Sequence, residues 1–217
     1  MIPRPLSYLR RPMASLFGQT GAVRVIGELA RHGGSLSTGE LMAATRLARS
    51  NVAANLETLI DQGVVEGHGQ GRSRRFAVRF DHPLVPEIVA LCRAEDRRFH
   101  SILDEIRGIA ENTGATAAWL YGSVARGEDR PGSDLDLAIL WPDPDEAEDR
   151  ARNCLRAVED RQKLTISLVA LGPADIDRLV AENDPWWSAL AAEAIALTGP
   201  APAAVAGPAP SAPRRSQ

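Results

Sequence analysis

The sequence predicts an α+β protein in two parts: an N-terminal domain of helices with a small β hairpin, then a linker helix, then a C-terminal domain with a mixed sheet and flanking helices. Three observations predict this class. Helical periodicity over roughly the first sixty residues ends in two short β runs, a heptad-like pattern covers 85–109, and short buried-strand patterns follow residue 112. We therefore predict an arm at 1–17, a first domain at 18–80, the linker helix at 81–111, a second domain at 112–198 and a tail at 199–217.

Charge is distributed unevenly along the chain. The formal net charge of −3 disfavours a nucleic-acid binder when it is taken as a single number. Residues 1–80, however, hold eleven arginines against five acidic residues, a net of +6, whereas 114–198 hold eight basic and sixteen acidic residues, a net of −8. A basic first third favours a nucleic-acid partner for that domain. The open alternative is that solvated faces differ in charge by chance.

Several classes of protein are excluded by composition. Cys92 and Cys154 lie too far apart to indicate a disulfide framework or a zinc site, and the four histidines show no paired ligand spacing. No apolar run approaches the ~20 residues that a membrane span needs. The N-terminus carries arginines and prolines without the apolar core of a secretory signal. We expect a cytoplasmic protein without a membrane anchor.

The first domain begins with three predicted helices. The first covers about Thr20–Arg31, and a second begins at Ser37, with Glu40 at capping-box spacing, and continues to about Thr45. The third covers about Ala48–Gln62. One face of the third helix is apolar at positions i, i+4, i+7 and i+8, so that face should lie in the core; its residues are Val52, Leu56, Leu59 and Ile60.

The outer face of the third helix carries small and amide side chains. Ser50 and Asn51 point outward in that phase, and Arg49 and Asn55 flank them. Such side chains fit the major groove of double-stranded DNA, where asparagine can pair with the edge of adenine. We predict Arg49, Ser50, Asn51 and Asn55 as DNA contacts.

Two β runs then flank a basic, glycine-rich tip. Val64–Glu66 and Phe76–Val78 should pair as a hairpin, and Arg72, Arg74 and Arg75 lie on its tip and returning strand, within reach of phosphates or a minor groove. Over roughly 18–80 the pattern resembles the winged helix-turn-helix of bacterial transcription regulators. The resemblance implies DNA binding, and a protein-interaction module of the same fold is the alternative.

The linker helix has a heptad-like seam. Val85, Cys92, Phe99 and Ile106 recur every seven residues, beside a second row that is interrupted by Glu95. The seam predicts a homodimer through the 85–109 helix, as the reading of palindromic DNA would require. A single helix packed between the two domains is the alternative.

The second domain holds the sharpest motif. A buried strand at 117–121 leads into Gly122–Gly127, and a second strand covers Ser133–Leu140. A strand that opens through Gly-Ser onto a helix offers backbone N–H groups to a phosphate. Asp134 and Asp136, two positions apart on a strand, face the same way, and paired carboxylates suit Mg²⁺.

The run GSVARGEDRPGSDLDLAIL resembles the signature of the minimal nucleotidyltransferases of the DNA polymerase β-like superfamily, in which GSxARG is followed by SDxD. The resemblance implies a domain over about 112–198. It further implies that Asp134 and Asp136 bind Mg²⁺ (or Mn²⁺) and carry catalysis, and that a nucleoside triphosphate (NTP) is held by Gly122, Ser123, Arg126 and Ser133. For Arg126, contact with the phosphates and bracing of the two acids both stay open.

One position departs from that family. Its members carry a third carboxylate on a later strand, whereas the predicted strand Leu164–Val169, after a polar helix at about 145–161, places Ser167 there. A hydroxyl carries no charge and cannot act as a base near neutral pH. Whether the chain is an enzyme is therefore open, and binding of Mg-NTP is better supported than turnover.

The end of the chain is predicted as a short helix from Pro173, a final helix from about Asn183 to Leu197 and a Pro/Ala-rich disordered tail. Trp186 and Trp187 at the start of the final helix either pack in the core, which we favour, or stack a base.

The leading hypothesis is a DNA-binding regulator whose nucleotidyltransferase-like domain binds Mg-NTP. The alternative is an active nucleotidyltransferase that transfers a nucleoside monophosphate to a protein, RNA or small molecule. A partner protein is implied only by the resemblance, because minimal members of that family often work in toxin–antitoxin pairs. A third alternative is a protein in which both folds have lost their ligands.

Overall fold

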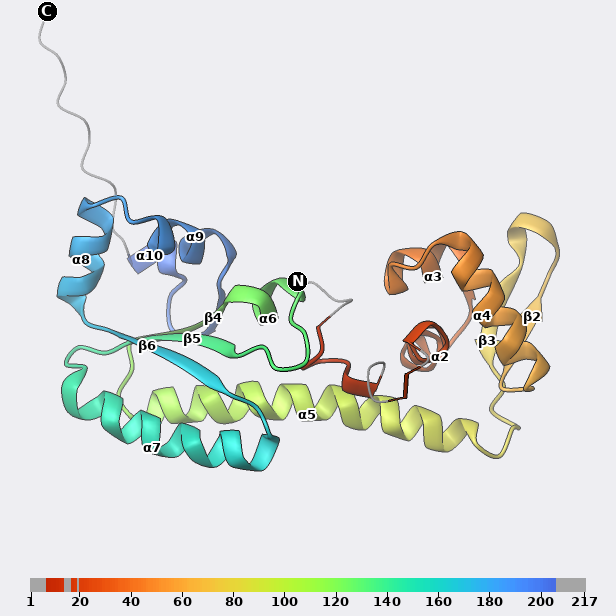
Figure 1. Cartoon of the computed structure of the whole chain (residues 1–217), viewed down its shortest axis with the longest axis horizontal. Helices are drawn as coiled ribbons and strands as arrows, with labels where there is room; N and C mark the ends of the chain where they lie inside the picture. The colour runs from red at the N-terminus through yellow and green to blue at the C-terminus, as the bar shows by residue number, and fades with distance from the viewer. Residues whose placement is uncertain (1–6, 14–16, 19, 206–217) are drawn as a thin grey trace, which may run out of the picture. The chain divides into compact units, whose positions relative to one another are not determined.

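The computed structural model describes residues 7–13, 17–18 and 20–205, and it confirms the predicted α+β class (Figure 1). The described chain divides into two compact units. The N-terminal unit ends at His100 and the C-terminal unit begins at Ser101, so helix α5 (Val85–Asn112) contributes to both. No helix in the described ranges is long and apolar enough to cross a membrane.

The N-terminal unit contains the three predicted helices and the hairpin. Its elements are α2 (Thr20–His32), β1 (Leu36–Ser37), α3 (Thr38–Thr45), α4 (Arg49–Asp61), β2 (Val65–His68), a 3-10 turn η1 (Gly71–Ser73) and β3 (Arg75–Val78). The strands form an antiparallel sheet in the order β1-β3-β2. Strand β1, which the sequence analysis did not predict, adds an edge to the hairpin and completes the winged-helix arrangement.

Local sequence signals account for these boundaries. The capping box at the start of α3 is present: the Glu40 N–H donates to Ser37 Oγ at 3.3 Å, and the Ser37 N–H donates to Glu40 Oε2 at 2.7 Å. The apolar face of α4 is buried as predicted at Val52, Leu56 and Leu59. It packs with α2 and the hairpin into one hydrophobic core.

Helix α5 buries its heptad positions within the chain itself. Val85, Cys92, Phe99 and Ile106 are all 4% exposed or less. Val85 and Cys92 belong to the core of the N-terminal unit. The seam offers no exposed apolar row, so it gives no support to the predicted homodimer through 85–109.

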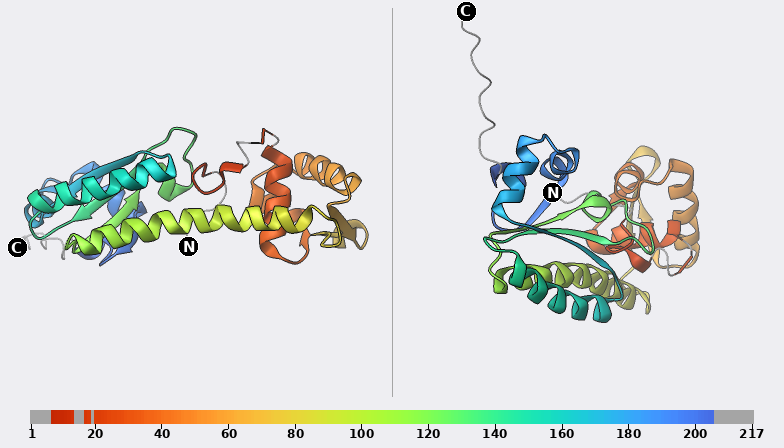
Figure 2. Two further views of the ribbon diagram at one scale, coloured as in Figure 1. Left: turned by 90° about the horizontal axis from the view of Figure 1, so that it is seen from below. Right: turned by 60° about the vertical axis from the view of Figure 1, so that its left-hand side comes forward.

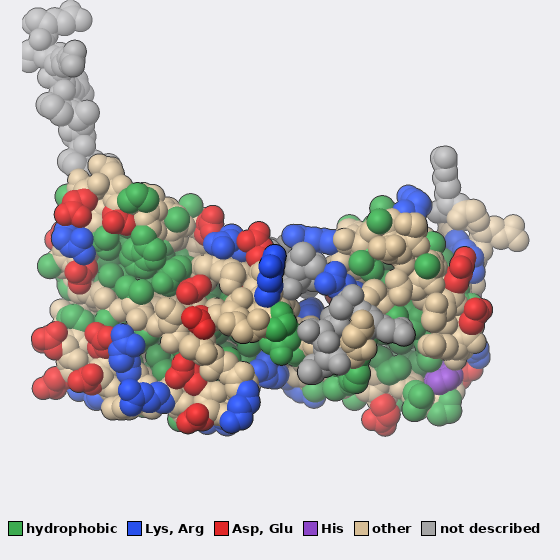
Figure 3. Space-filling model, viewed as in Figure 1, with side chains coloured by type: hydrophobic (Ala, Val, Ile, Leu, Met, Phe, Trp, Pro, Cys, Tyr) green, Lys and Arg blue, Asp and Glu red, His purple; other side chains and the backbone are tan. Residues whose placement is uncertain are grey.

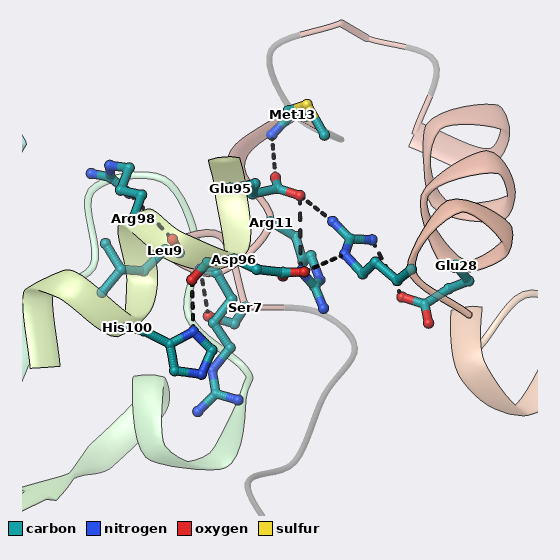
Figure 4. Close-up of polar contacts among 11 residues, drawn as sticks. Ser7, Leu9, Arg11, Met13, Glu28, Glu95, Asp96, Arg98 and His100 are labelled. Carbon is teal, nitrogen blue, oxygen red and sulfur yellow. Dashed lines mark hydrogen bonds and ion pairs between the residues drawn. The ribbon is translucent and has the colours of Figure 1, made fainter. Parts of the chain in front are cut away.

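Glu95, the charged residue that interrupts the seam, is buried and paired (Figure 4). One carboxylate oxygen accepts a hydrogen bond from the Met13 N–H at 2.9 Å, and the other forms an ion pair with Arg31 of α2. The neighbouring Asp96 pairs with Arg11, and with Arg31 Nε at 3.2 Å. Burial raises the pKa of Glu95, while the Met13 N–H and the two guanidiniums oppose that rise. The network ties residues 11–13, α2 and α5 together.

The C-terminal unit is a four-stranded sheet with helices on both faces. Strands β4 (Ala117–Tyr121), β5 (Leu135–Leu140), β6 (Ile166–Leu171) and β7 (Ile195–Thr198) lie in the order β6-β5-β4-β7. Only the β5–β6 pair is parallel. The helices are α6 (Gly122–Arg126), α7 (Asp145–Gln162), α8 (Pro173–Ala181), α9 (Pro185–Glu193) and α10 (Pro202–Val205).

The two faces of this sheet are covered differently. The second half of α5 and α7 lie on one face, and α8 and α9 lie on the other (Figures 1 and 2). Trp119, Ala138 and Leu171 on the second face pack against apolar residues of both covering helices, among them Ile176 and Trp187. The central strands β4 and β5 are buried on both sides along most of their length, which explains their near-continuous apolar sequences.

Side chains form hydrogen bonds with backbone N–H and carbonyl groups on both edge strands of the sheet. On β6 the Ile166 N–H donates to Glu159 Oε1 at 2.7 Å, and Arg152 Nη2 donates to the Leu168 carbonyl at 3.2 Å. On β7 the Leu197 carbonyl accepts from Arg107 Nε at 2.8 Å. Backbone groups that would otherwise face solvent are therefore satisfied by helices α5 and α7.

The predicted final helix is wrong beyond Glu193. Ala194 is extended, and residues 195–198 form strand β7, antiparallel to β4. Strand β4 would otherwise be an uncovered edge, and pairing there outweighs the helical preference of the alanine-rich sequence. Residues 199–205 also differ from the predicted disordered tail: Trp119 Nε1 donates to the Pro200 carbonyl at 2.8 Å and Pro202 is buried. The rest of the predicted tail, 206–217, lies outside the described residues, as do 1–6 and 14–16 of the predicted arm.

Substitution of Glu95 tests the buried network. Glu95→Ala removes the acceptor of the Met13 N–H and leaves Arg31 without its buried partner, so we expect the free energy of unfolding to fall by about 3 kcal/mol. Glu95→Gln keeps an acceptor and should cost less. The measurement is chemical denaturation, with the exposed Glu87→Ala on the same helix as control, expected within about 0.5 kcal/mol of wild type. Equal effects of Glu95→Ala and Glu87→Ala would contradict the assignment.

Candidate functional site

Three polar side chains form one row across the sheet of the C-terminal unit. Tyr121 of β4 lies opposite Asp136 of β5, and Asp136 lies opposite Ser167 of β6. Directly paired residues on neighbouring strands point to the same face. Trp119 and Ala138, two positions along on the same strands, pack under α8 and α9. The row therefore lies on that face, at the end of its hydrophobic layer.

Asp134 and Asp136 are close enough to affect each other. Asp136 is half-buried and Asp134, just before β5, is exposed. Burial and the negative charge of Asp134 raise the pKa of Asp136, and the charge of Arg126 opposes that rise. Two carboxylates that share a face and repel each other favour a bound cation.

Gly122 is required by its contact with Asp136. Its φ angle is +70°, in the left-handed region that favours glycine. A Cβ atom at this position would collide with the Asp136 carboxylate and would lie 2.8 Å from its Cγ. The absence of a side chain lets the turn between β4 and α6 approach the carboxylate directly. Gly122 and Asp136 are thus brought together, and half-buried Ser123 follows Gly122 directly.

Arg126 is held by two glutamates that the sequence analysis did not single out. Its Nε donates to Glu128 Oε2 and its Nη1 donates to Glu193 Oε2, both at 2.9 Å. These bonds raise the pKa of Arg126. The positive charge of the Arg126 guanidinium lowers the pKa of Asp136, but its N–H groups donate to Glu128 and Glu193. Glu128 is close in sequence, but Glu193 is 67 residues away and no local pattern marks it.

Ser133 organises the loop before the aspartate pair. Its hydroxyl accepts from the Arg130 N–H at 2.9 Å, and its own N–H donates to the Arg130 carbonyl at 2.9 Å. These bonds close a turn immediately before Asp134. The assignment of Ser133 to nucleotide binding stays a prediction.

The register of β6 supports the alignment of Ser167 with the third acid of the family motif. Ser167 is half-buried and is paired with Asp136. Across the described part of the chain, no group of three or more His, Cys, Asp or Glu side chains is placed to hold a metal ion. Glu159 of α7 accepts a hydrogen bond at Oε1 from the Ile166 N–H of β6, at 2.7 Å.

The predicted DNA contacts on α4 separate into two groups. Arg49, Ser50 and Asn51 are exposed on its first turn. Asn55 instead donates from Nδ2 to the Asn51 carbonyl at 2.6 Å. Its amide lies against α2, where a Cβ on Gly21 would be 2.5 Å from Nδ2. Asn55 therefore has a local structural role that its position on the helix did not reveal.

The arginines of the hairpin also differ from one another. Arg75 donates to the Ser35 carbonyl at 2.6 Å and pairs with Glu40 Oε2 at 3.1 Å, so it braces β1 and α3. Arg74 is exposed and lies over the Phe76 ring at 5.1 Å. The side chain of Arg72 lies outside the described residues. Arg74 is thus the better placed of the two described arginines to contact a ligand.

Comparison with known families agrees with both halves. Residues 104–182 match the family model described as "Polymerase beta, Nucleotidyltransferase", and residues 19–75 match that of the MarR family. The chain joins a MarR-like winged helix to a polymerase-β-type nucleotidyltransferase domain. The predicted resemblances and the DNA-binding class of the first domain are confirmed at this level. No curated protein and no solved structure matches this chain.

Substitution of Gly122 tests its contact with Asp136. Gly122→Ala should lower the free energy of unfolding by more than Gly114→Ala, because both have positive φ but only Gly122 faces an obstacle. Left-handed strain alone is worth about 1–2 kcal/mol, and the collision adds about 1–3 kcal/mol. In an Asp136→Ala background the cost of Gly122→Ala should fall toward that of Gly114→Ala without reaching it, because the Cβ of residue 136 would still lie 3.1 Å from the new methyl group. Thermal or chemical denaturation of this double-mutant cycle is the measurement, and additive effects would contradict the contact.

Proposed function

We propose that the protein is a cytoplasmic DNA-binding regulator whose nucleotidyltransferase-type domain binds a magnesium–NTP complex. The observation that carries the proposal is the row in which Asp136 lies between Tyr121 and Ser167, with Asp134 close enough for its charge to raise the pKa of Asp136. Gly122 places the backbone of the GSVARG motif against Asp136 of the SDLD motif. This combination offers carboxylates to a cation and a glycine-opened turn to a triphosphate.

The donor atoms of the site fit magnesium. Asp134 and Asp136 would hold the ion, and the Ser167 hydroxyl would be a neutral oxygen ligand beside them. The ion would supply positive charge to the triphosphate. Arg126 adds positive charge next to the same site. Ionisation of Asp136 is already penalised by burial and by Asp134, so its carboxylate gains more than a solvated aspartate from a nearby cation.

The same row argues for binding over turnover. In an active enzyme of the polymerase β type, the third carboxylate can accept the proton of the attacking hydroxyl. Ser167 cannot accept it near neutral pH. We infer that the domain binds a nucleotide without turning it over.

An active nucleotidyltransferase is the second candidate. The observation that favours it is that the GSVARG and SDLD motifs are both present and lie against each other where Gly122 meets Asp136. The acceptor would be a protein, RNA or small molecule, and a partner protein is expected if the chain works in a toxin–antitoxin pair.

Calorimetry of Mg²⁺ and Mg-ATP tests the nucleotide site. We expect binding by wild type and loss of binding in Asp134→Ala/Asp136→Ala. Ser167→Asp should bind Mg²⁺ more tightly, because it restores a third charge. As the pH falls, Mg²⁺ affinity should weaken at a higher pH than for a solvated aspartate, since the pKa of Asp136 is raised. Asp177→Ala, an exposed acid on α8, is the matched control.

Outcomes of that experiment separate the two candidates. No binding of Mg-ATP or Mg-GTP by wild type would overturn the nucleotide site. Transfer of label from an α-labelled NTP by wild type, lost in the double mutant, would make the protein an enzyme. Unchanged Mg²⁺ affinity in Ser167→Asp would mean that Ser167 does not occupy the third acid position.

DNA binding is tested by fluorescence anisotropy against genomic duplexes, including the region upstream of its own gene. Affinity should fall steeply with salt, because arginine–phosphate contacts release counterions. Arg49→Ala and Arg74→Ala should each weaken binding and reduce the slope of log affinity against log salt by about one. Arg150→Ala, an exposed arginine of α7, should change neither. Absence of salt-sensitive binding to any duplex at micromolar protein would overturn this part of the proposal.

A further inference from the structure

The aromatic side chains of the C-terminal unit fall into two groups. Between residues 101 and 205 the sequence has five aromatic residues, and Trp119, Trp141 and Trp187 are 5% exposed or less. Tyr121 and Trp186 are half-buried and keep accessible surface. In this unit, therefore, any aromatic contact with a ligand has to come from these two residues.

Tyr121 and Trp186 contact each other. Their ring centroids are 5.7 Å apart and the ring planes meet at 86°, an edge-to-face arrangement. In such a pair, the ring that contributes its edge keeps its own two faces clear of the contact. A flat ring can stack on such a face.

The start of α9 determines the directions in which Trp186 and Trp187 point. Asp184 caps the helix, and its Oδ1 accepts from the N–H groups of Trp186 at 2.8 Å and Trp187 at 3.1 Å. Trp187 then packs edge-to-face on buried Trp119, at 5.9 Å between centroids. Trp186, one position earlier on the helix, is directed to Tyr121 instead. The core preference predicted for the tryptophan pair thus holds fully for Trp187 and only in part for Trp186.

The aromatic pair lies beside the aspartate pair. Tyr121 is directly opposite Asp136 in the β4–β5 register. Burial, with the charge of Asp136, raises the pKa of the Tyr121 phenol, so the ring stays neutral at physiological pH. Figure 3 shows hydrophobic side chains gathered between α8 and α9 on this unit, with acidic side chains nearby. The half-buried apolar residues around this core are Tyr121, Val169, Val180, Trp186, Ala194 and Val205.

We propose that Trp186, supported by Tyr121, is the platform on which the base of the nucleotide stacks, and that it favours a purine. This inference rests on the proposed function, because it assumes that the triphosphate is held beside Asp134 and Asp136. A purine offers a larger ring than a pyrimidine to the same aromatic face, and stacking on an aromatic side chain tolerates either purine. The platform sets the preference for base size, while the aspartates and the Gly122 turn hold the phosphates.

The experiment compares a ligand with a base and one without. Calorimetry with Mg-tripolyphosphate measures the phosphate site, and Mg-ATP adds the ribose and base. We expect wild type to bind ATP roughly tenfold more tightly than tripolyphosphate, a size typical of one stacked base. Trp186→Leu keeps an apolar side chain but removes the ring, and it should bind the two ligands about equally. Its affinity for tripolyphosphate should stay at the wild-type value.

Matched controls keep the result interpretable. Trp187→Phe, the adjacent position, should lower stability while it keeps the wild-type ratio of ATP to tripolyphosphate affinity. Wild type alone should also bind ATP and GTP more tightly than CTP and UTP, a comparison that holds even if Trp186→Leu does not fold.

The outcomes distinguish failure of the proposed nucleotide site from failure of the Trp186 platform. Failure of wild type to bind tripolyphosphate and ATP would overturn the proposed function itself. Binding of tripolyphosphate with no gain for ATP, no difference between purines and pyrimidines, or a wild-type ratio in folded Trp186→Leu would overturn the platform and leave the phosphate site standing.

Discussion

In-register pairing of three neighbouring strands places Tyr121, Asp136 and Ser167 in one row, and a one-residue slip of any one strand would turn its member of the row to the opposite face. That register is maintained by the hydrophobic layer on the same face. Trp119, Ala138 and Val169 form the next row and pack under α8 and α9. The polar row of the site therefore continues the apolar face of the same strands, and the packing of that face fixes the positions of the polar side chains.

The carboxylates of Glu95 in the N-terminal unit and Asp136 in the C-terminal unit have contrasting surroundings. Glu95 is surrounded by donors, since Arg31 and the Met13 N–H both reach its carboxylate. Asp136 has another carboxylate beside it, and the nearest guanidinium, that of Arg126, is engaged by Glu128 and Glu193. The first network is satisfied within the protein and serves stability. The second is left with excess negative charge, which an external cation would neutralise.

Sequence reasoning reached the fold through signals that act locally. The capping box at Ser37, the apolar face of α4 and the GSVARG–SDLD run each depend on residues close in the chain, and each is found in the structure. Strand β7 was missed because its identity depends on pairing with β4, about 75 residues away, and not on its alanine-rich sequence. The engagement of Arg126 by Glu193 was missed for the same reason. The hydrogen bonds of Asn55 and Arg75 within the chain were not foreseen, because a position on a helix or hairpin does not reveal which backbone carbonyl its side chain meets.

The side chains on the two edges of the C-terminal sheet restrict how this domain can associate with other chains. Glu159 and Arg152 occupy backbone groups of β6, and Arg107 occupies one of β7. A peptide that tried to extend the sheet would have to displace charged side chains from hydrogen bonds they already make. Recruitment of a partner by strand addition, and aggregation by the same route, are both disfavoured. Association through the side chains and loops of the domain is not restricted in this way.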